Sequence, residues 1–253
     1  AEYDGGIWGS GIWDDDAGSD NWISADFNER LAGTRTIPST GGGYYDIRRV
    51  NYFLDNYQKI EDDFETYKHY LGEAYWFRAY FYFNRVKQYG NVRYVTKPLK
   101  MDSEELYVAR TPRQQVIDSI IADLDKAIEF MSSGPNEGGT RLNKEIAQLY
   151  KSRVCLYEGT WEKYHDGTVF GVPNPKVDEY LKMAADAAQG VMNSGHYSIY
   201  STGDPEHDFL NIFNQLDYAS HPEIMFWIKY DMSMDMWHYH QEDLTYRGAN
   251  GGL

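Results

Sequence analysis

The chain has 253 residues and a formal net charge of −15, from 24 Lys and Arg against 39 Asp and Glu. A protein neutralises a nucleic-acid backbone with a clustered cationic face, so this acidity argues against a nucleic-acid partner. The one cysteine, Cys155, excludes an internal disulfide framework and a cysteine-based metal site. No apolar run reaches the roughly 18–20 residues of a membrane-spanning helix. Seven Trp, 23 Tyr and 11 Phe outnumber the cationic residues, and this surplus suggests binding of neutral, polar ligands.

Residues 1–43 are rich in Gly, Asp and Ser and lack helical periodicity, yet they contain Trp8, Trp13 and Trp22. Their charge is one-sided, because eight acidic residues precede the first basic residue, Arg30. A disordered acidic tail would not require three tryptophans. We therefore predict an N-terminal region of ordered loops in which at least one indole is exposed.

Two helices are predicted in the next part of the chain. Residues 44–60 carry apolar side chains at three- and four-residue spacing, which places them on one stripe. Residues 67–89 carry aromatic side chains all round the helix, which predicts burial on most faces. Glu73, Arg78 and Arg85 lie within this second helix and are expected to pair within the protein, because a buried charge needs a partner.

The next predicted helix has a well-marked start. Thr111 is expected to be its N-cap, Pro112 occupies the first helical position and Gln114 completes a capping box. An apolar face then continues for about five turns to Met131.

Two further helices are predicted at 144–158 and at 174–193, the second with Gly195 as its stop signal. The intervening residues 159–173 are predicted to form a loop. The short apolar run 224–228 follows a His-Pro pair, so a buried strand is favoured there over a helix.

The predicted helices form sequential antiparallel pairs joined by turns or loops. Such pairs are similar to tetratricopeptide units, although the strict consensus is not met. The predicted fold is therefore mainly α: a tetratricopeptide-like helical-repeat core (an α-α superhelix) with long aromatic-rich loops and little β structure. Within one domain we expect an N-terminal loop region at 1–43, a paired-helix repeat core at 44–195 and a loop-rich region at 196–253.

Several short motifs occur in a fixed order along the chain. One helix contains Gly72-Glu73-Ala74 and Arg78-Ala79-Tyr80, and Tyr89-Gly90-Asn91-Val92 and Thr96-Lys97-Pro98 follow it. Further stretches are Ser19–Trp22, Asn51-x-x-Leu54, Thr111-Pro112 with Ile121–Ala127, Ala147–Tyr157 and Glu223–Phe226. The series resembles the SusD/RagB family, whose members have a Gly-Glu-Ala-x-Phe-x-Arg-Ala-Tyr-type helix, a Tyr-Gly-x-Val-Pro turn and a Thr-x-Pro segment. Arg93 stands where proline is usual in that turn.

The resemblance implies a surface-exposed outer-membrane lipoprotein of Bacteroidetes-type bacteria that captures oligosaccharides and delivers them to a TonB-dependent, SusC-like transporter. In that family the helical repeats mainly contact the transporter, while loops outside them hold the glycan. We accordingly expect no enzyme activity and no cofactor. The lipoprotein signal, the acylated cysteine that anchors the family to the membrane and the first helical segment are absent from this sequence. We therefore expect an incomplete portion of such a protein, whose second half would follow Leu253.

A glycan site needs an aromatic platform for the flat C–H face of a sugar ring and polar side chains at its edge for the hydroxyl groups. The first loop region and the last one supply this mixture. The candidate ligand-binding residues are Trp8, Trp13, Asp20, Asn21, Trp22, Trp237, Tyr239 and Tyr246. The competing interpretation is that these side chains only fix the loops on the domain.

Two other functions remain open. A peptide- or protein-binding helical-repeat scaffold would hold its ligand on the concave helix surface. A helical glycoside hydrolase would need two carboxylates on opposite sides of the scissile bond. With 39 acidic residues in the chain, such a pair can always be chosen, so the presence of acidic residues does not support this function. Metal sites are not favoured, since Asp14-Asp15-Asp16 lacks the spacing of a calcium loop and His238-Tyr239-His240 with Glu242 and Asp243 is a weak zinc pattern. Cys155 fits a small core residue.

Overall fold

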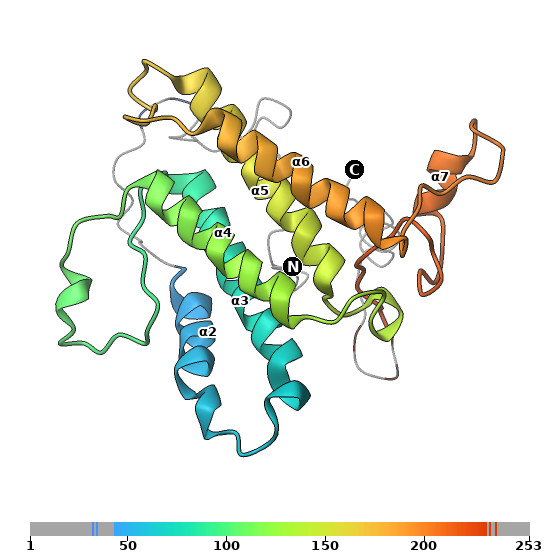
Figure 1. The fold of residues 1–253 in the computed structure, drawn as a ribbon, viewed down its shortest axis with the longest axis horizontal. Coiled ribbons are helices and arrows are strands. Elements are labelled where there is room, and N and C mark those ends of the chain that lie inside the picture. The colour runs from blue at the N-terminus through green and yellow to red at the C-terminus, as the bar shows by residue number, and fades with distance from the viewer. Residues whose placement is uncertain (1–31, 33, 35–42, 232, 234–235, 237–253) are drawn as a thin grey trace, which may run out of the picture. The chain divides into compact units, whose positions relative to one another are not determined.

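The computed structural model describes residues 32, 34, 43–231, 233 and 236, and Figure 1 shows them as a coloured ribbon. These residues are mainly helical and form no strand, only isolated bridges between single residues. The α-helices are α2 (Tyr45–Asn56), α3 (Phe64–Tyr89), α4 (Arg113–Phe130), α5 (Lys144–His165), α6 (Val177–Ser194) and α7 (Asp208–Phe213). Three short 3-10 turns accompany them: η1 (Tyr57–Lys59), η2 (Glu104–Leu106) and η3 (Glu137–Gly139). The prediction of a mainly α fold is confirmed.

Helices in the unit Gly43–Ile228 pack against their neighbours in the chain (Figure 1). α3 packs against α4 and α5 packs against α6, while α4 also contacts α5, so the two helix pairs are adjacent. α2 packs against α3. Sequential packing of helix pairs is the arrangement of tetratricopeptide-like repeats. No helix within the described residues is both long enough and apolar enough to cross a membrane.

α4 supplies much of the hydrophobic core. Its side chains Val116, Ile117, Ile120 and Leu124 are completely buried, because they lie on one stripe of a helix that contacts both α3 and α5. Complete burial of one such side chain contributes about 1.5–3 kcal/mol. Cys155 of α5 belongs to the same core, as predicted, and burial raises the pKa of its thiol to about 12.

Glu73, Arg78 and Arg85 of α3 pair within the protein, as predicted. Arg78 donates to both carboxylate oxygens of Asp123 on α4, at 2.7 and 2.6 Å. Glu73 accepts two hydrogen bonds from the guanidinium of Arg141, at 2.7 and 2.8 Å. Arg85 donates to a backbone carbonyl just before α2, at 3.2 Å. Each contact joins α3 to a segment distant in sequence.

The predicted start of α4 is wrong. The helix begins at Arg113 with Pro112 as its N-cap, and no side chain caps it. Thr111 lies outside the helix because it pairs with Val92 through an isolated antiparallel bridge. Gln114 completes no capping box and donates instead to a carboxylate of α5.

The predicted loop 159–173 is helical in its first half. α5 was predicted to end at Glu158 but continues to His165. Gly159 does not interrupt the helix, and its missing side chain allows α6 to pack closely against it. A Cβ at this position would lie 2.9 Å from Cδ2 of Leu181, so a larger residue would push the two helices apart.

The apolar run 224–228 does not form the predicted strand. Within it, Trp227 donates its backbone N–H to the carbonyl of Gly139 at 3.1 Å and its indole N–H to the carbonyl of Gly138 at 2.8 Å. The apolar run therefore packs on η3 instead of joining a sheet. α7 was not predicted, because six residues are too few to show a helical period.

Candidate functional site

The residues predicted to bind a glycan lie outside the described residues, so their role stays a prediction. They are Trp8, Trp13, Asp20, Asn21, Trp22, Trp237, Tyr239 and Tyr246. The patterns considered for calcium and zinc, at 14–16 and 238–243, lie outside as well. In the part of the chain that the structure does describe, no group of three or more His, Cys, Asp or Glu side chains could hold a metal ion.

A different aromatic surface occupies the C-terminal turns of α5. Tyr157, Trp161 and His165 follow one another at four-residue spacing, which places their side chains on one helix face. The ring centroids of Tyr157 and Trp161 are 6.1 Å apart with an interplanar angle of 23°, and those of Trp161 and His165 are 3.9 Å apart at 16°. Phe170 contacts the His165 ring edge-on, at 6.1 Å and 90°. We call these four residues the α5 aromatic ladder.

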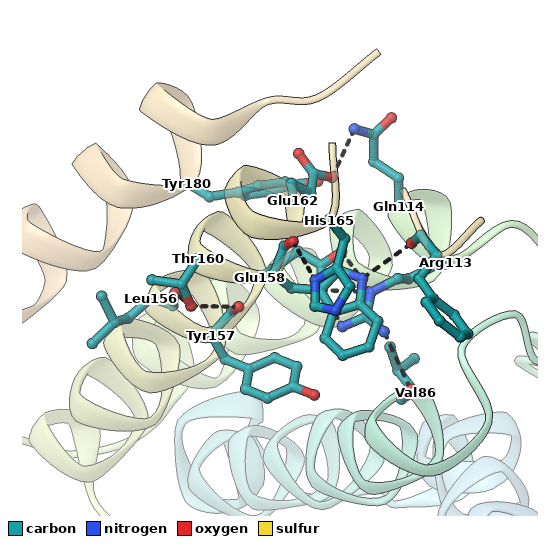
Figure 2. A network of polar contacts seen from close by, with 12 residues as sticks. Val86, Arg113, Gln114, Leu156, Tyr157, Glu158, Thr160, Glu162, His165 and Tyr180 are labelled. Carbon is teal, nitrogen blue, oxygen red and sulfur yellow. Dashed lines mark hydrogen bonds and ion pairs between the residues drawn. The ribbon is translucent and has the colours of Figure 1, made fainter. Parts of the chain in front are cut away.

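Arg113 of α4 packs against two rings of the α5 aromatic ladder. Its guanidinium carbon lies 4.1 Å from the ring centroid of Trp161 and 5.6 Å from that of Tyr157, within the range of a cation–π interaction. The same guanidinium donates three hydrogen bonds to the carboxylate of Glu158, at 2.7 to 2.9 Å (Figure 2). Burial raises the pKa of the Glu158 carboxyl, and the bonds from Arg113 oppose the rise. The Arg113 side chain is 5% exposed and the Glu158 side chain is 0% exposed, so the ion pair is buried.

Glu162 joins the ladder helix to both of its neighbours. Its carboxylate accepts from the side-chain amide of Gln114 on α4, at 3.0 Å, and from the backbone N–H of Lys176 at the start of α6. Figure 2 shows Glu162 between Gln114 and Tyr180. Tyr180 is itself buried and donates to Asp118 of α4 at 2.7 Å. Burial, and then this hydrogen bond, raise the pKa of the Tyr180 hydroxyl.

Around this fixed centre the ladder is partly open to solvent. Phe170 is 64% exposed and the neighbouring Tyr164 is 73% exposed, while Trp161 and His165 are half-buried. His165 donates its Nδ1–H to the carbonyl of Trp161 at 2.9 Å, and the Trp161 indole N–H donates to the carbonyl of Phe170 at 3.3 Å. These two hydrogen bonds hold the rings in place, and flat rings that are partly exposed suit a ligand with apolar faces.

The ladder was missed in the sequence because residues 159–173 were predicted to be a loop. The signal that could have found it is the four-residue spacing of Tyr157, Trp161 and His165, which continues the helical period past Gly159. The partner Arg113 could not have been identified in this way, since it lies 45 residues from Glu158.

A second aromatic group lies in the segment after α6, and its contacts are all within that segment. The His221 ring stacks on Tyr200 at 4.8 Å and meets Tyr218 edge-on at 5.7 Å. Nδ1 of His221 accepts the backbone N–H groups of Glu223 and Ile224. These contacts fold the segment on itself.

Comparison with known proteins identifies the family. A model of SusD-like proteins, described as starch-binding associating with outer membrane, matches residues 14–156. SusD-like protein P2 of Formosa agariphila is 27% identical over 190 residues, which cover 74% of this chain and 32% of that protein. A solved SusD-like protein of Bacteroides fragilis NCTC 9343 is 25% identical with a TM-score of 0.58, over 74% of this chain and 32% of that one. B. fragilis NanU is 21% identical with a TM-score of 0.55, over 77% and 35%.

The chain spans about a third of the length of the curated relatives it matches. The residues matched by the family model include α2, α3, α4 and the first half of α5. Because this match covers more than half of the chain, the protein belongs to the SusD-like family.

Proposed function

We propose that the chain is part of a non-enzymatic protein that binds oligosaccharides at the bacterial cell surface. The observation that carries this proposal is the family match over residues 14–156, since the family is described as starch-binding and associated with the outer membrane. The buried ion pairs of α3, α4 and α5 support a scaffold role for the helices. In this proposal the helices hold aromatic binding surfaces in place, and no bond of the glycan is made or broken.

The proposed contacts are the loop residues predicted from the sequence, with Trp22 and Trp237 as the main platforms. Their indoles would stack on sugar rings, and Asp20 and Asn21 would bind the hydroxyl groups. The α5 aromatic ladder is a second candidate surface, because it combines partly exposed rings with a rigid attachment.

We further propose that the bound oligosaccharide is passed to a TonB-dependent, SusC-like transporter in the outer membrane, and that a lipid anchor holds the protein there. Affinity purification of the transporter tests this part, with the expectation that this protein is recovered with it. Recovery of the transporter without it from detergent-solubilised outer membranes would contradict the partnership.

Affinity electrophoresis in gels that contain starch tests glycan binding. We expect retention of the wild-type chain, and a Kd raised about tenfold or more by Trp22→Ala and by Trp237→Ala, which corresponds to about 1.4 kcal/mol each. Tyr45→Ala is the matched control, because Tyr45 is an aromatic side chain on α2 that is 70% exposed. Normal retention of both tryptophan variants would show that Trp22 and Trp237 are not the main platforms. Retention by neither starch nor any other polysaccharide would refute the proposed function.

The absence of chemistry is tested with the same polysaccharides. Incubation with the protein should release no new reducing ends. Release that follows the protein through purification would show a glycoside hydrolase instead.

A further inference from the structure

Two cations lie together where α3 meets α5. Lys87 is on α3 and Arg153 is on α5, and both side chains are exposed. The Nζ atom of Lys87 lies 5.1 Å from the ring centroid of Phe83, and the same ring contacts Tyr150 and Tyr157 on either side of Arg153 in α5, at 6.0 and 5.3 Å. The two helices thus bring both cations to one aromatic surface. We call Lys87, Arg153, Tyr150 and Tyr157 the α3/α5 cationic patch.

The two cations are close enough to repel each other. Partial burial, and then the positive charge of Arg153, lower the pKa of Lys87. Within the described residues neither side chain forms an ion pair with a carboxylate. Holding two like charges close together in this way is unfavourable unless an anion is bound between them.

Neither α5 nor the part of α3 after Glu73 exposes a carboxylate beside this surface. All three carboxylates of α5, on Glu145, Glu158 and Glu162, are buried and hydrogen-bonded inside the protein. α3 has no acidic residue after Glu73. The charges that α5 exposes are therefore cationic, although the whole chain carries a net charge of −15.

The aromatic rings beside the cations continue along both helices. Tyr150 contacts Tyr80 of α3 at 5.9 Å, and Tyr157 is the first member of the α5 aromatic ladder. An anionic group bound at the cations would thus lie beside a row of rings that continues in both directions. Guanidinium and ammonium groups bind carboxylate and sulfate through charge-assisted hydrogen bonds, and arginine does so in a bidentate manner.

We propose that the α3/α5 cationic patch binds the carboxylate or sulfate group of an acidic oligosaccharide, with the adjoining sugar ring against Tyr150 or Tyr157. The inference rests on the proposed glycan-binding function and adds a charged ligand class at a separate site. Two neighbouring cations fit one anionic substituent on a sugar ring better than the row of carboxylates that an acidic protein segment would present.

Isothermal titration calorimetry of the intact chain tests the patch with three sugars: trigalacturonate, a sulfated carrageenan tetrasaccharide and neutral maltotriose. We expect at least one anionic sugar to bind more tightly than maltotriose, with an affinity that falls as salt is raised. K87Q and R153Q should each weaken that binding about tenfold and leave maltotriose binding unchanged. Whichever anionic sugar responds to the variants identifies carboxylate or sulfate as the ligand group.

The control is K182Q, because Lys182 is an exposed lysine on α6 with an acidic neighbour of its own, Asp186. Far-UV circular dichroism checks that all variants are folded. The proposal is wrong if neither anionic sugar binds more tightly than maltotriose. It is also wrong if K87Q and R153Q bind the anionic sugar as tightly as the wild type does. Binding of a Glu-Leu repeat peptide in place of the sugars, with the same dependence on Lys87, would also overturn it and indicate a protein partner.

The outcome separates this patch from the proposed function. If neither the wild type nor any variant binds maltotriose or starch, neutral-glycan binding is refuted. The measurements with the anionic sugars then decide separately whether the patch binds an anion. Starch binding that persists without any anionic binding would refute the patch alone.

Discussion

Removing one partner of the Arg113–Glu158 pair should strongly destabilise the protein. The side chains are 5% and 0% exposed and share three hydrogen bonds of 2.7 to 2.9 Å. Loss of one partner leaves an uncompensated charge in the interior, which costs about 3–5 kcal/mol. We therefore expect Glu158→Gln and Arg113→Met each to lower the free energy of unfolding by about that amount. The double variant Arg113→Met with Glu158→Leu should lose far less than the sum, because no charge then remains buried.

Urea denaturation followed by far-UV circular dichroism measures these changes. Glu137→Gln is the control, because the Glu137 side chain is 62% exposed and its pairing with Arg141 should contribute less than about 1 kcal/mol. Additive costs in the double variant, or a loss below about 1 kcal/mol in Glu158→Gln, would refute the reasoning.

Two further predictions concern buried titratable groups. Burial opposes ionisation of Glu145, but hydrogen bonds from Ser133, Gly134 and His196 outweigh it and lower the carboxyl pKa. The stabilisation is then present above the ordinary pKa and is lost as pH falls through the lowered one, so Glu145→Gln should cost about 1–3 kcal/mol at pH 7 and less at an acidic pH where the carboxyl of the folded protein is protonated. Equal costs at both pH values in urea denaturation would contradict this. Burial raises the pKa of the Cys155 thiol to about 12. Iodoacetamide at pH 8 should therefore modify Cys155 at least about 100-fold more slowly in the native than in the unfolded protein. Similar rates in the two states would show that the thiol is accessible.

Much of the helical architecture could be predicted from residue spacing. The apolar stripe of α4 is an example, because Ile117, Ile120 and Leu124 pack as the period requires. The end of α5 could not, since Gly159 is a local stop signal and its tolerance depends on Leu181 of another helix. The start of α4 was missed for a similar reason: the isolated bridge of Thr111 is a tertiary contact.

The candidate site was predictable to a smaller extent. Aromatic residues in loops indicate a glycan platform by composition, and those at Trp22 and Trp237 still await a test. The α5 aromatic ladder depends on a long-range partner, because Arg113 is brought to Trp161 only by the packing of α4 on α5. The cationic patch likewise results from helix packing, since Lys87 and Arg153 are 66 positions apart in a strongly acidic sequence.

The contact between Trp227 and η3 has a consequence for how the protein opens. Two hydrogen bonds join positions 89 and 88 residues apart, and the chain between them contains all of α5 and α6. This stretch is therefore a loop whose two ends are held together by non-covalent contacts while the Trp227 hydrogen bonds persist. Because α5 and α6 also pack on each other within this loop, their local unfolding should occur as one cooperative unit that includes the Trp227 contacts.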